Sequence, residues 1–171
     1  MNFFWRDVQV PSLFRKTLSG VKVKHCKNTA DCQAVRMPVP DQVVIPMSQH
    51  MGTPCDLQVQ VGDTVTVGQL IGDSNAFLSA PIHSSVSGTV SAIVDFVTVN
   101  GDKCKAVTIE TDKEQTPCPD LHPPVVKSHQ DLVKAARDCG LVGLGGAGFP
   151  THIKLNPKNL DQVDTLVING A

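Results

Sequence analysis

The chain contains no tyrosine and a single tryptophan, and its 15 Lys and Arg nearly balance its 16 Asp and Glu. The formal net charge of −1 gives no basic excess of the kind that nucleic-acid-binding domains carry, so we expect no nucleic-acid partner. Aromatic residues are scarce while valine recurs throughout, which favours strands packed through β-branched side chains. A length of 171 residues allows one ordinary domain or two small ones.

Long hydrophobic runs are also missing. A membrane-spanning helix needs about 20 mostly apolar residues, and the opening stretch MNFFWRDVQVPSLFRKTL has no sustained apolar core of the secretory type. The sequence therefore predicts a protein that has no membrane span of its own and that lies beside a membrane if membranes matter.

None of the cysteines forms a C-x-x-C pair, so the usual signals for a zinc site or an iron–sulfur cluster are absent. The stretch HCKNTADC has unusual spacing for a metal site and lacks a fourth ligand. We predict free thiols, no metal ligands and no iron–sulfur cluster in this chain. The cysteines are Cys26, Cys32, Cys55, Cys104, Cys118 and Cys139.

Two histidines, His50 and His83, stand beside serines in SQH and HSS. A Ser/His nucleophile pair requires a geometry that a sequence does not supply. We interpret both as polar residues of turns, and we predict no catalytic side chain.

Prolines and polar residues crowd KEQTPCPDLHPPVVKS, which disfavours helix and central strand and indicates a linker. The predicted organisation is an N-terminal extension, a β domain, a Pro-rich linker and a second module. Their bounds are 1–37, 38–112, 113–127 and 128–171.

The predicted β domain is a series of short strands separated by Gly, Pro, Asn and Asp. Gly62-Asp63 and Gly101-Asp102 each lie between β-branched runs, which predicts a hairpin at both places and a pseudo-symmetric sandwich or barrel. The strand candidates are 43–46, 57–61, 64–72, 88–94 and 105–111.

The phrases VQVGDTVTVGQLIG and APIHSSVSGTVSAI resemble the biotinyl/lipoyl-type barrel-sandwich hybrid. In that family a carrier lysine lies on a hairpin tip between the two phrases. Here the intervening stretch, DSNAFLSAP at 73–81, has no lysine. The resemblance therefore implies the fold of this family but not its carrier function. It implies that the domain serves as a structural shell or a docking surface.

The second module begins with a helix signal. Ser128 and Asp131 make a capping box, and Gly140 is a natural stop after Cys139. The predicted apolar face of this helix comprises Leu132, Ala135, Ala136 and Cys139. Pro150 is placed to open a second helix, and 165–169 is predicted to be a buried strand.

Glycines are concentrated in GLVGLGGAGFPTHIKL, residues 140–155. Gly143 to Gly148 matches G-x-G-x-x-G, but a helix rather than a strand is predicted before it, so we reject an ordinary dinucleotide-binding βαβ unit. Two interpretations stay open. The loop is a packing turn or linker, or its backbone N–H groups approach a ligand phosphate beside a helix end and Lys154.

The longer pattern G-x-x-G-x-G-G-A-G-F-P-T-x-x-K resembles the flavin-binding loop of the NADH-oxidising subunit of respiratory complex I. THIKL resembles the C subunit of the Rnf ion-translocating electron-transport complex. VVIPMSQHMGTPC, the barrel with its lysine-free stretch and VDTLVINGA also resemble that subunit, in the same order. This resemblance covers the chain from about residue 18 to 171.

The resemblance implies an FMN site, with NADH as substrate. Lys154 would face a phosphate, Phe149 would lie near the dinucleotide, and Asn169 would contact the flavin. Leu144 stands where the complex I relative has arginine, which removes a cation. The implied cofactor-binding residues are Gly143, Gly145, Gly146, Gly148, Phe149, Lys154 and Asn169.

The implied fold class is β + α/β: a barrel-sandwich hybrid followed by the truncated start of a complex I FMN-subunit-like α/β domain. The implied protein is a peripheral subunit on the cytoplasmic face of the cell membrane. It would pass electrons from NADH through FMN and two [4Fe–4S] centres to other subunits of the complex, with ferredoxin as an indirect partner.

The implied iron–sulfur centres belong to a region beyond Ala171, so the chain is expected to be an N-terminal fragment that is inactive alone and binds FMN weakly. The alternative is a non-catalytic docking module whose glycine loop only packs. Ligand binding distinguishes the two.

Overall fold

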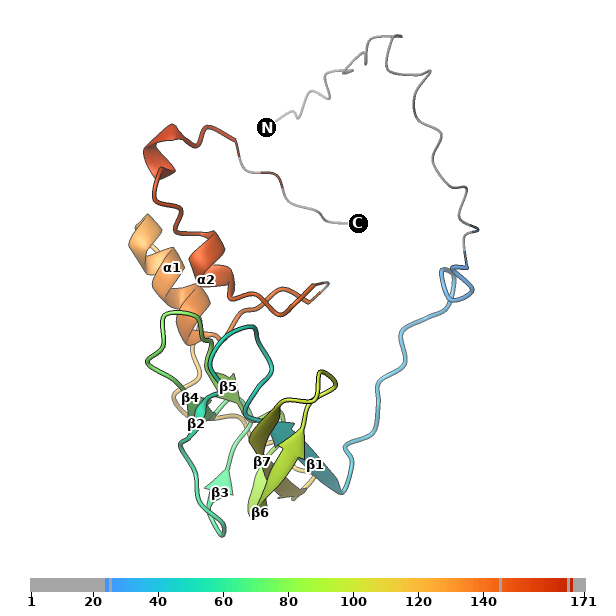
Figure 1. Ribbon diagram of the computed structural model, residues 1–171. Helices are drawn as coiled ribbons and strands as arrows, with labels where there is room; N and C mark the ends of the chain where they lie inside the picture. The colour runs from blue at the N-terminus through green and yellow to red at the C-terminus, as the bar shows by residue number, and fades with distance from the viewer. Residues whose placement is uncertain (1–23, 25, 145, 166, 168–171) are drawn as a thin grey trace. The chain divides into compact units, whose positions relative to one another are not determined.

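Figure 1 shows the computed structural model of the chain, which describes residues 24, 26–144, 146–165 and 167. Met1–Met37 and Pro38–Ala171 form two separate units. The described residues of the first unit contain no helix or strand and make one turn, in which the Ala30 amide donates to the Lys27 carbonyl at 3.2 Å. The fold and the candidate site described below belong to the second unit.

The barrel is made of two antiparallel sheets (Figure 1). The first has the strand order β1 (Gln42–Pro46), β7 (Lys103–Thr111), β6 (Gly88–Val97) and β3 (Thr64–Val65). The second has the order β2 (Asp56–Leu57), β4 (Leu70–Asp73) and β5 (Ile82–His83).

β-Branched residues dominate the space between the sheets, as the composition predicts. Val65, Ile71, Val90 and Ile109 are fully excluded from solvent, and Met47 fills the remaining space beside them. Burial of each such side chain contributes on the order of 1.5–3 kcal/mol. This core holds together strands that are individually too short to be stable.

One of the two predicted Gly-Asp hairpins is confirmed. Gly101, with φ +88°, turns β6 into β7, and the two strands pair from Val97–Lys103 to Gly88–Thr111. The other is wrong, because the turn at Gly62 joins strands of different sheets. The Gly62 amide instead donates to the carbonyl of Val90 in β6 at 2.8 Å.

Strand lengths also differ from the prediction. The candidates 57–61 and 64–72 shrink to β2, β3 and β4, and β5 was not predicted. Where the chain passes from one sheet to the other it makes isolated backbone hydrogen bonds instead of continuous strand pairing. For example, the Gln58 amide donates to the Ile71 carbonyl at 2.9 Å. A two-residue strand such as β5 has too few residues to show an alternating pattern.

The Pro-rich segment begins against the barrel. Val67 and Pro117 form an isolated parallel bridge, and the Thr116 amide donates to the Ser87 hydroxyl at 2.9 Å. The Cys118 amide donates to the Val67 carbonyl at 2.8 Å. The first part of the segment is therefore attached to the barrel surface.

Helix α1 (His129–Asp138) has the predicted capping box. The Ser128 hydroxyl accepts from the Asp131 amide at 3.1 Å, and the Asp131 carboxylate accepts from the Ser128 amide at 2.9 Å. Gly140, with φ +65°, follows the C-cap. The predicted apolar face is wrong in part, because only Ala136 is buried, whereas Leu132 and Cys139 are exposed.

The short helix α2 (Thr151–Lys154) lies beside α1 in Figure 1, and His129 Nε2 is 2.7 Å from the Leu155 carbonyl oxygen. Pro150 is the N-cap, one residue earlier than predicted. A 3₁₀ turn, η2 (Leu160–Gln162), follows. The predicted strand at 165–169 falls mostly outside the described residues, and Thr165 and Val167 are not in a strand.

Candidate functional site

The glycine-rich loop is a narrow hairpin between α1 and α2. The Gly143 amide donates to the Phe149 carbonyl at 3.1 Å, and the Thr151 amide donates to the Leu141 carbonyl at 2.9 Å. Val142 and Pro150 form an antiparallel bridge between these two bonds. The loop therefore has its own backbone support, and its tip is free to approach another molecule.

Two glycines of this stretch fit the loop to the barrel. Gly148 has φ +65°, its carbonyl accepts from the Met51 amide at 3.1 Å, and a Cβ there would lie 3.1 Å from the Gln49 carbonyl oxygen. Gly140 also has φ +65°, and its Cβ would lie 2.3 Å from the Pro81 carbonyl oxygen. A side chain at Gly140 would clash with the barrel backbone, and one at Gly148 would be strained by the positive φ and by a tight contact with that backbone.

Gly146 is different. A Cβ on this residue would meet nothing within 4 Å, its φ is outside the left-handed region, and the residue is exposed. Contacts among the described residues therefore give no reason for a glycine at this position. The bare backbone of Gly146 is open to a ligand.

A cation lies at the base of the loop. The Lys154 ammonium is 5.7 Å from the centroid of the Phe149 ring, and it is 3.2 Å from where a Cβ of Gly143 would be. The ammonium supplies a positive charge that can attract a phosphate. Helix α2 has only four residues, so the expected helix-end contribution to phosphate binding is small.

A cavity of about 980 Å³ separates the loop from the barrel. This is at the upper end of the roughly 300–1,000 Å³ typical of ligand pockets. The loop wall is formed by Gly140, 142–144 and 146–148, and the barrel wall by 48–52, 80–83, 98–100 and Asp102. Segments far apart in the sequence thus enclose one space large enough for a mononucleotide.

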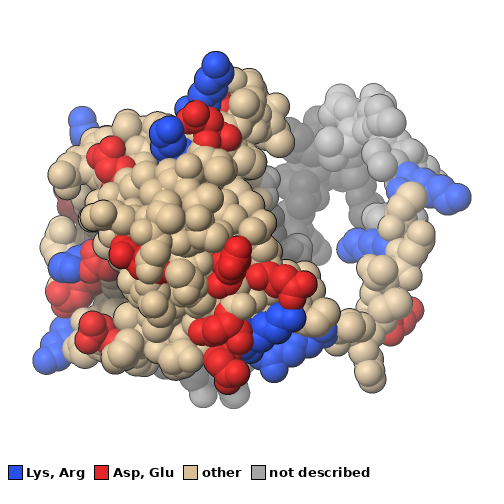
Figure 2. Space-filling model, turned by 90° about the horizontal axis from the view of Figure 1, so that it is seen from below, with Lys and Arg blue, Asp and Glu red and all other residues tan. Residues whose placement is uncertain are grey.

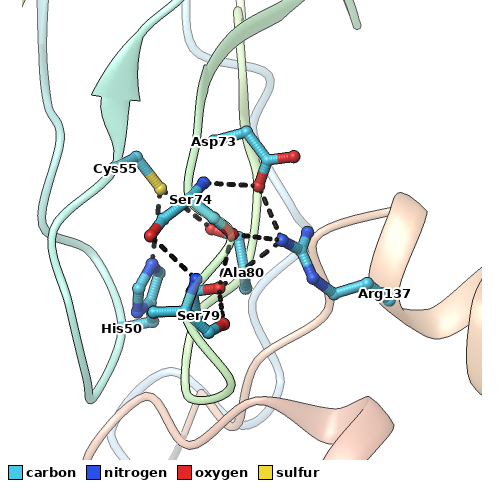
Figure 3. Close-up of polar contacts among 8 residues, drawn as sticks. His50, Cys55, Asp73, Ser74, Ser79, Ala80 and Arg137 are labelled. Carbon is cyan, nitrogen blue, oxygen red and sulfur yellow. Dashed lines mark hydrogen bonds and ion pairs between the residues drawn. The ribbon is translucent and has the colours of Figure 1, made fainter.

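Arg137 connects α1 to the lysine-free stretch of the barrel, as Figure 3 shows. Its Nη2 donates to Asp73 Oδ1 at 2.7 Å and to the Ser74 carbonyl at 2.9 Å, and lies 3.4 Å from the Ser79 hydroxyl. Ser79 also donates to the Ser74 carbonyl at 2.9 Å. Arg137 was not predicted as a site residue, because its only signal in the sequence is a basic residue in the last turn of a helix.

The histidine and cysteine at the end of VVIPMSQHMGTPC meet in the interior (Figure 3). Cys55 Sγ lies 3.5 Å from His50 Nε2 and donates to the Ala80 carbonyl at 3.2 Å. Burial, reinforced by the Asp73 carboxylate, raises the pKa of the Cys55 thiol to about 11. The thiol is therefore protonated, and the pair is structural rather than nucleophilic.

His50 lies at a bend, in agreement with its interpretation as a turn residue, and it is buried, whereas His83 lies in β5, so its interpretation as a turn residue is wrong. His83 is half-buried on the cavity wall, where burial lowers the pKa of its imidazole and the Asp73 carboxylate partly offsets that effect. Within the described residues neither ring hydrogen-bonds a serine. A Ser/His nucleophile is absent from this part of the chain.

Charges of both signs are interspersed on the face shown in Figure 2. Lys105 and Asp95 form an exposed ion pair at 2.8 Å. The described residues contain no group of three or more His, Cys, Asp or Glu that could hold a metal. No helix among them has the length and apolar character to cross a bilayer.

These observations define a class: a barrel-sandwich hybrid without a lysine in its 73–81 stretch, followed by a glycine loop whose backbone faces a nucleotide-sized cavity. Family models agree with that class. Residues 15–114 match the RnfC barrel sandwich hybrid domain, and residues 136–171 match the Nuo51 FMN-binding domain of complex I. The chain belongs to the RnfC barrel-sandwich-hybrid family.

Curated relatives carry names that agree with this family. The chain is 44% identical over 135 residues to the C subunit of the Na(+)-translocating ferredoxin:NAD(+) oxidoreductase complex of Acetobacterium woodii, covering 77% of this chain and 30% of the relative. It is 40% identical over 148 residues to the proton-translocating counterpart of Clostridium ljungdahlii, covering 85% and 32%.

A third relative is the C subunit of the ion-translocating oxidoreductase complex of Pseudomonas aeruginosa, which is 37% identical over 141 residues, covering 78% of this chain and 18% of the relative. The chain thus spans less than a third of the length of these relatives. The predicted family and fold class are confirmed.

The structure brings five of the seven predicted cofactor-binding residues into one hairpin and its continuation, and the other two, Gly145 and Asn169, lie outside the described residues. Their assignment to FMN stays a prediction. The five are Gly143, Gly146, Gly148, Phe149 and Lys154.

Proposed function

We propose that this chain binds FMN through its glycine loop as part of a subunit that oxidises NADH in an ion-translocating electron-transport complex. The observation that carries the proposal is the open backbone of Gly146, at the tip of a hairpin that faces a cavity of about 980 Å³. A Cβ added at Gly140, Gly143 or Gly148 would meet atoms of this chain, whereas one added at Gly146 would meet none within 4 Å among the described residues.

In this proposal the backbone around Gly143 and Gly146 lies against the flavin, and Lys154 neutralises its phosphate. Phe149 lies beside the nicotinamide dinucleotide, and Gly148 holds the loop to the barrel. Gly145 and Asn169 complete the flavin contacts. Bound FMN would accept a hydride from NADH and release electrons singly, so the protein binds and orients the cofactor.

The larger function is proposed from the names of the relatives, which are subunits of ferredoxin:NAD(+) oxidoreductase or ion-translocating oxidoreductase complexes. The subunit would be peripheral, on the cytoplasmic face of the cell membrane, with other subunits of the complex as direct partners and ferredoxin as an indirect one. Two [4Fe–4S] centres would be held by residues outside this chain. This chain alone is expected to be inactive.

FMN titration tests the proposal. Flavin fluorescence is followed as the full-length product of the gene is added, and the same is done with this 171-residue chain. We expect saturable binding by both, weaker for the shorter chain, because a phosphate contact open to water contributes little. Gly146→Val should weaken FMN binding at least tenfold, and the affinity of Gly146→Ala should lie between those of the wild type and Gly146→Val.

Because Gly146 has open space and an ordinary backbone conformation, both substitutions should leave the melting temperature nearly unchanged. Lost binding would then report a lost ligand contact rather than unfolding. Equal FMN affinity in the wild type and Gly146→Val contradicts the proposal.

The second candidate is a non-catalytic docking module. The contacts of Gly140 and Gly148 with the barrel favour it, because they give part of the glycine run a purely structural purpose. It replaces the first proposal if the full-length product binds no FMN.

A further inference from the structure

The cavity beside the glycine loop has a second wall that belongs to the barrel. It consists of three segments: the bend 48–52, the stretch 80–83 that includes β5, and the tip 98–102 of the β6–β7 hairpin, where Asn100 and Asp102 face the cavity. A ligand that covers the open backbone of Gly146 lies between this wall and the loop.

Direct contacts fix the two walls against each other. The Met51 amide donates to the Gly148 carbonyl at 3.1 Å, and Gly140 leaves no room for a side chain against the Pro81 carbonyl. Arg137 adds a charged connection to Asp73 at 2.7 Å. The barrel wall is therefore in place before any ligand arrives.

Charge is distributed unevenly around the cavity. Gly143 of the loop wall has the Lys154 ammonium 3.2 Å from where its Cβ would be, although Lys154 does not itself line the cavity, whereas the barrel hairpin contributes Asp102 to the lining. A ligand that combines a phosphate with a neutral ring would be repelled at its phosphate by Asp102 and attracted by Lys154. The favoured orientation points the phosphate to the loop base and the ring to the barrel.

His83 is the residue of the barrel wall best suited to that ring. Its imidazole is half-buried next to Gly140 and makes no hydrogen bond with any described residue. Its lowered pKa keeps the ring neutral near pH 7, so one nitrogen donates and the other accepts. A flavin ring edge carries both acceptors and a donor.

We propose that the barrel forms the second wall of the flavin site and that His83 hydrogen-bonds the polar edge of the flavin ring. The barrel is then part of the binding site rather than only a shell. This inference rests on the proposed function, since the ligand is the FMN held by the glycine loop.

Comparing FMN with riboflavin, which lacks the phosphate, separates the two ends of the site. We expect His83→Phe to weaken both ligands by the same factor, roughly threefold to tenfold, the range of one net hydrogen bond. Lys154→Ala should weaken FMN alone. His122, an exposed histidine of the Pro-rich segment outside the cavity, gives the matched control His122→Phe, which should change neither affinity.

Imidazole NMR of the wild type avoids any question of whether a variant folds. Long-range ¹H–¹⁵N spectra should show the His83 ring nitrogens shifting as FMN is added, while those of His122 stay in place. Unshifted His83 nitrogens at saturating FMN, or equal affinities of the wild type and His83→Phe, overturn the inference. If the His83 inference fails in this way but Gly146→Val still weakens FMN binding, the proposed function stands. If the wild type binds no FMN, the proposed function itself fails.

Discussion

Arg137 in the last turn of α1 donates to Asp73 at the end of β4, with 2.7 Å between Nη2 and Oδ1 (Figure 3). Asp73 opens the lysine-free stretch 73–81, the position at which biotinyl and lipoyl carriers of similar sequence hold their lysine. In this chain the stretch is fixed by the helix that leads into the glycine loop. A hairpin tip that serves as a carrier elsewhere is here a docking point between two modules.

Removing this ion pair should destabilise the chain measurably. Asp73→Asn or Arg137→Met is expected to lower the free energy of unfolding by about 1–2 kcal/mol, because the pair is shielded and charge-assisted, although its side chains retain 23% and 35% exposure. Urea unfolding of both variants and of the double variant gives the coupling energy.

The matched control is the exposed pair formed by Lys134 and Asp138 one turn apart on the same helix. Lys134→Met should cost about 0.5 kcal/mol or less. If Asp73→Asn and Arg137→Met are additive, the two side chains are not coupled in solution.

The glycines of the loop should respond to substitution in two different ways. Gly140→Ala and Gly148→Ala place a side chain at φ +65° against barrel backbone, which should cost about 1–3 kcal/mol each. Gly146→Ala should be neutral or stabilise the chain by up to about 1 kcal/mol, because alanine restricts the unfolded chain and nothing obstructs it. Thermal unfolding of the three variants measures the change in stability. Equal losses of stability at Gly140, Gly146 and Gly148 would contradict the distinction between the two kinds of glycine.

Much of the fold could be predicted because its signals are local. The capping box of Ser128, the stop at Gly140 and the turn at Gly101 each depend on a few neighbouring residues. The ion pair of Arg137 with Asp73 joins residues 64 positions apart, and no local sequence pattern near either residue predicts it. The same limit applies to the pairing of β5 and to the buried face of α1.

The site was predictable only in part, for a related reason. The glycine string identified the loop but gave every glycine the same role, because a sequence does not show what lies within reach of each missing Cβ. The structure separates Gly148, which contacts the barrel, from Gly146, where an added Cβ would meet no described residue within 4 Å. His83 was set aside as a turn residue, since its place on the cavity wall comes from the distant contact of Pro81 with Gly140.

Cys55 should be the least reactive of the described thiols. Its pKa of about 11, compared with an ordinary 9.0, leaves about a hundredfold less thiolate near neutral pH, and it is buried. Iodoacetamide labelling at pH 8 followed by peptide mass spectrometry should modify the exposed Cys26, Cys32 and Cys139 first. Cys55 should react at their rate only in denaturant, and fast labelling under native conditions would show that its surroundings open.

Acidification should destabilise the chain in a window set by two histidines. Burial lowers the pKa of His83 and of His152, and Arg137 adds to the effect at His152, whose Nδ1 is buried without a hydrogen-bond partner among the described residues. The unfolded chain therefore binds more protons than the folded chain below the ordinary value of 6.5.

The contribution of these histidines is accordingly complete above pH 6.5 and is lost as the pH falls through their lowered folded-state values. The lowered carboxylate pKa values of Asp112 and Asp131 act in a separate range, below their ordinary 3.8. Urea midpoints measured from pH 7.5 to 5 should fall in the wild type and fall less in His83→Gln and His152→Gln. The exposed His122 provides His122→Gln as a control. If the urea midpoints of His83→Gln and His152→Gln fall with pH as steeply as that of the control, neither part-buried histidine is linked to folding.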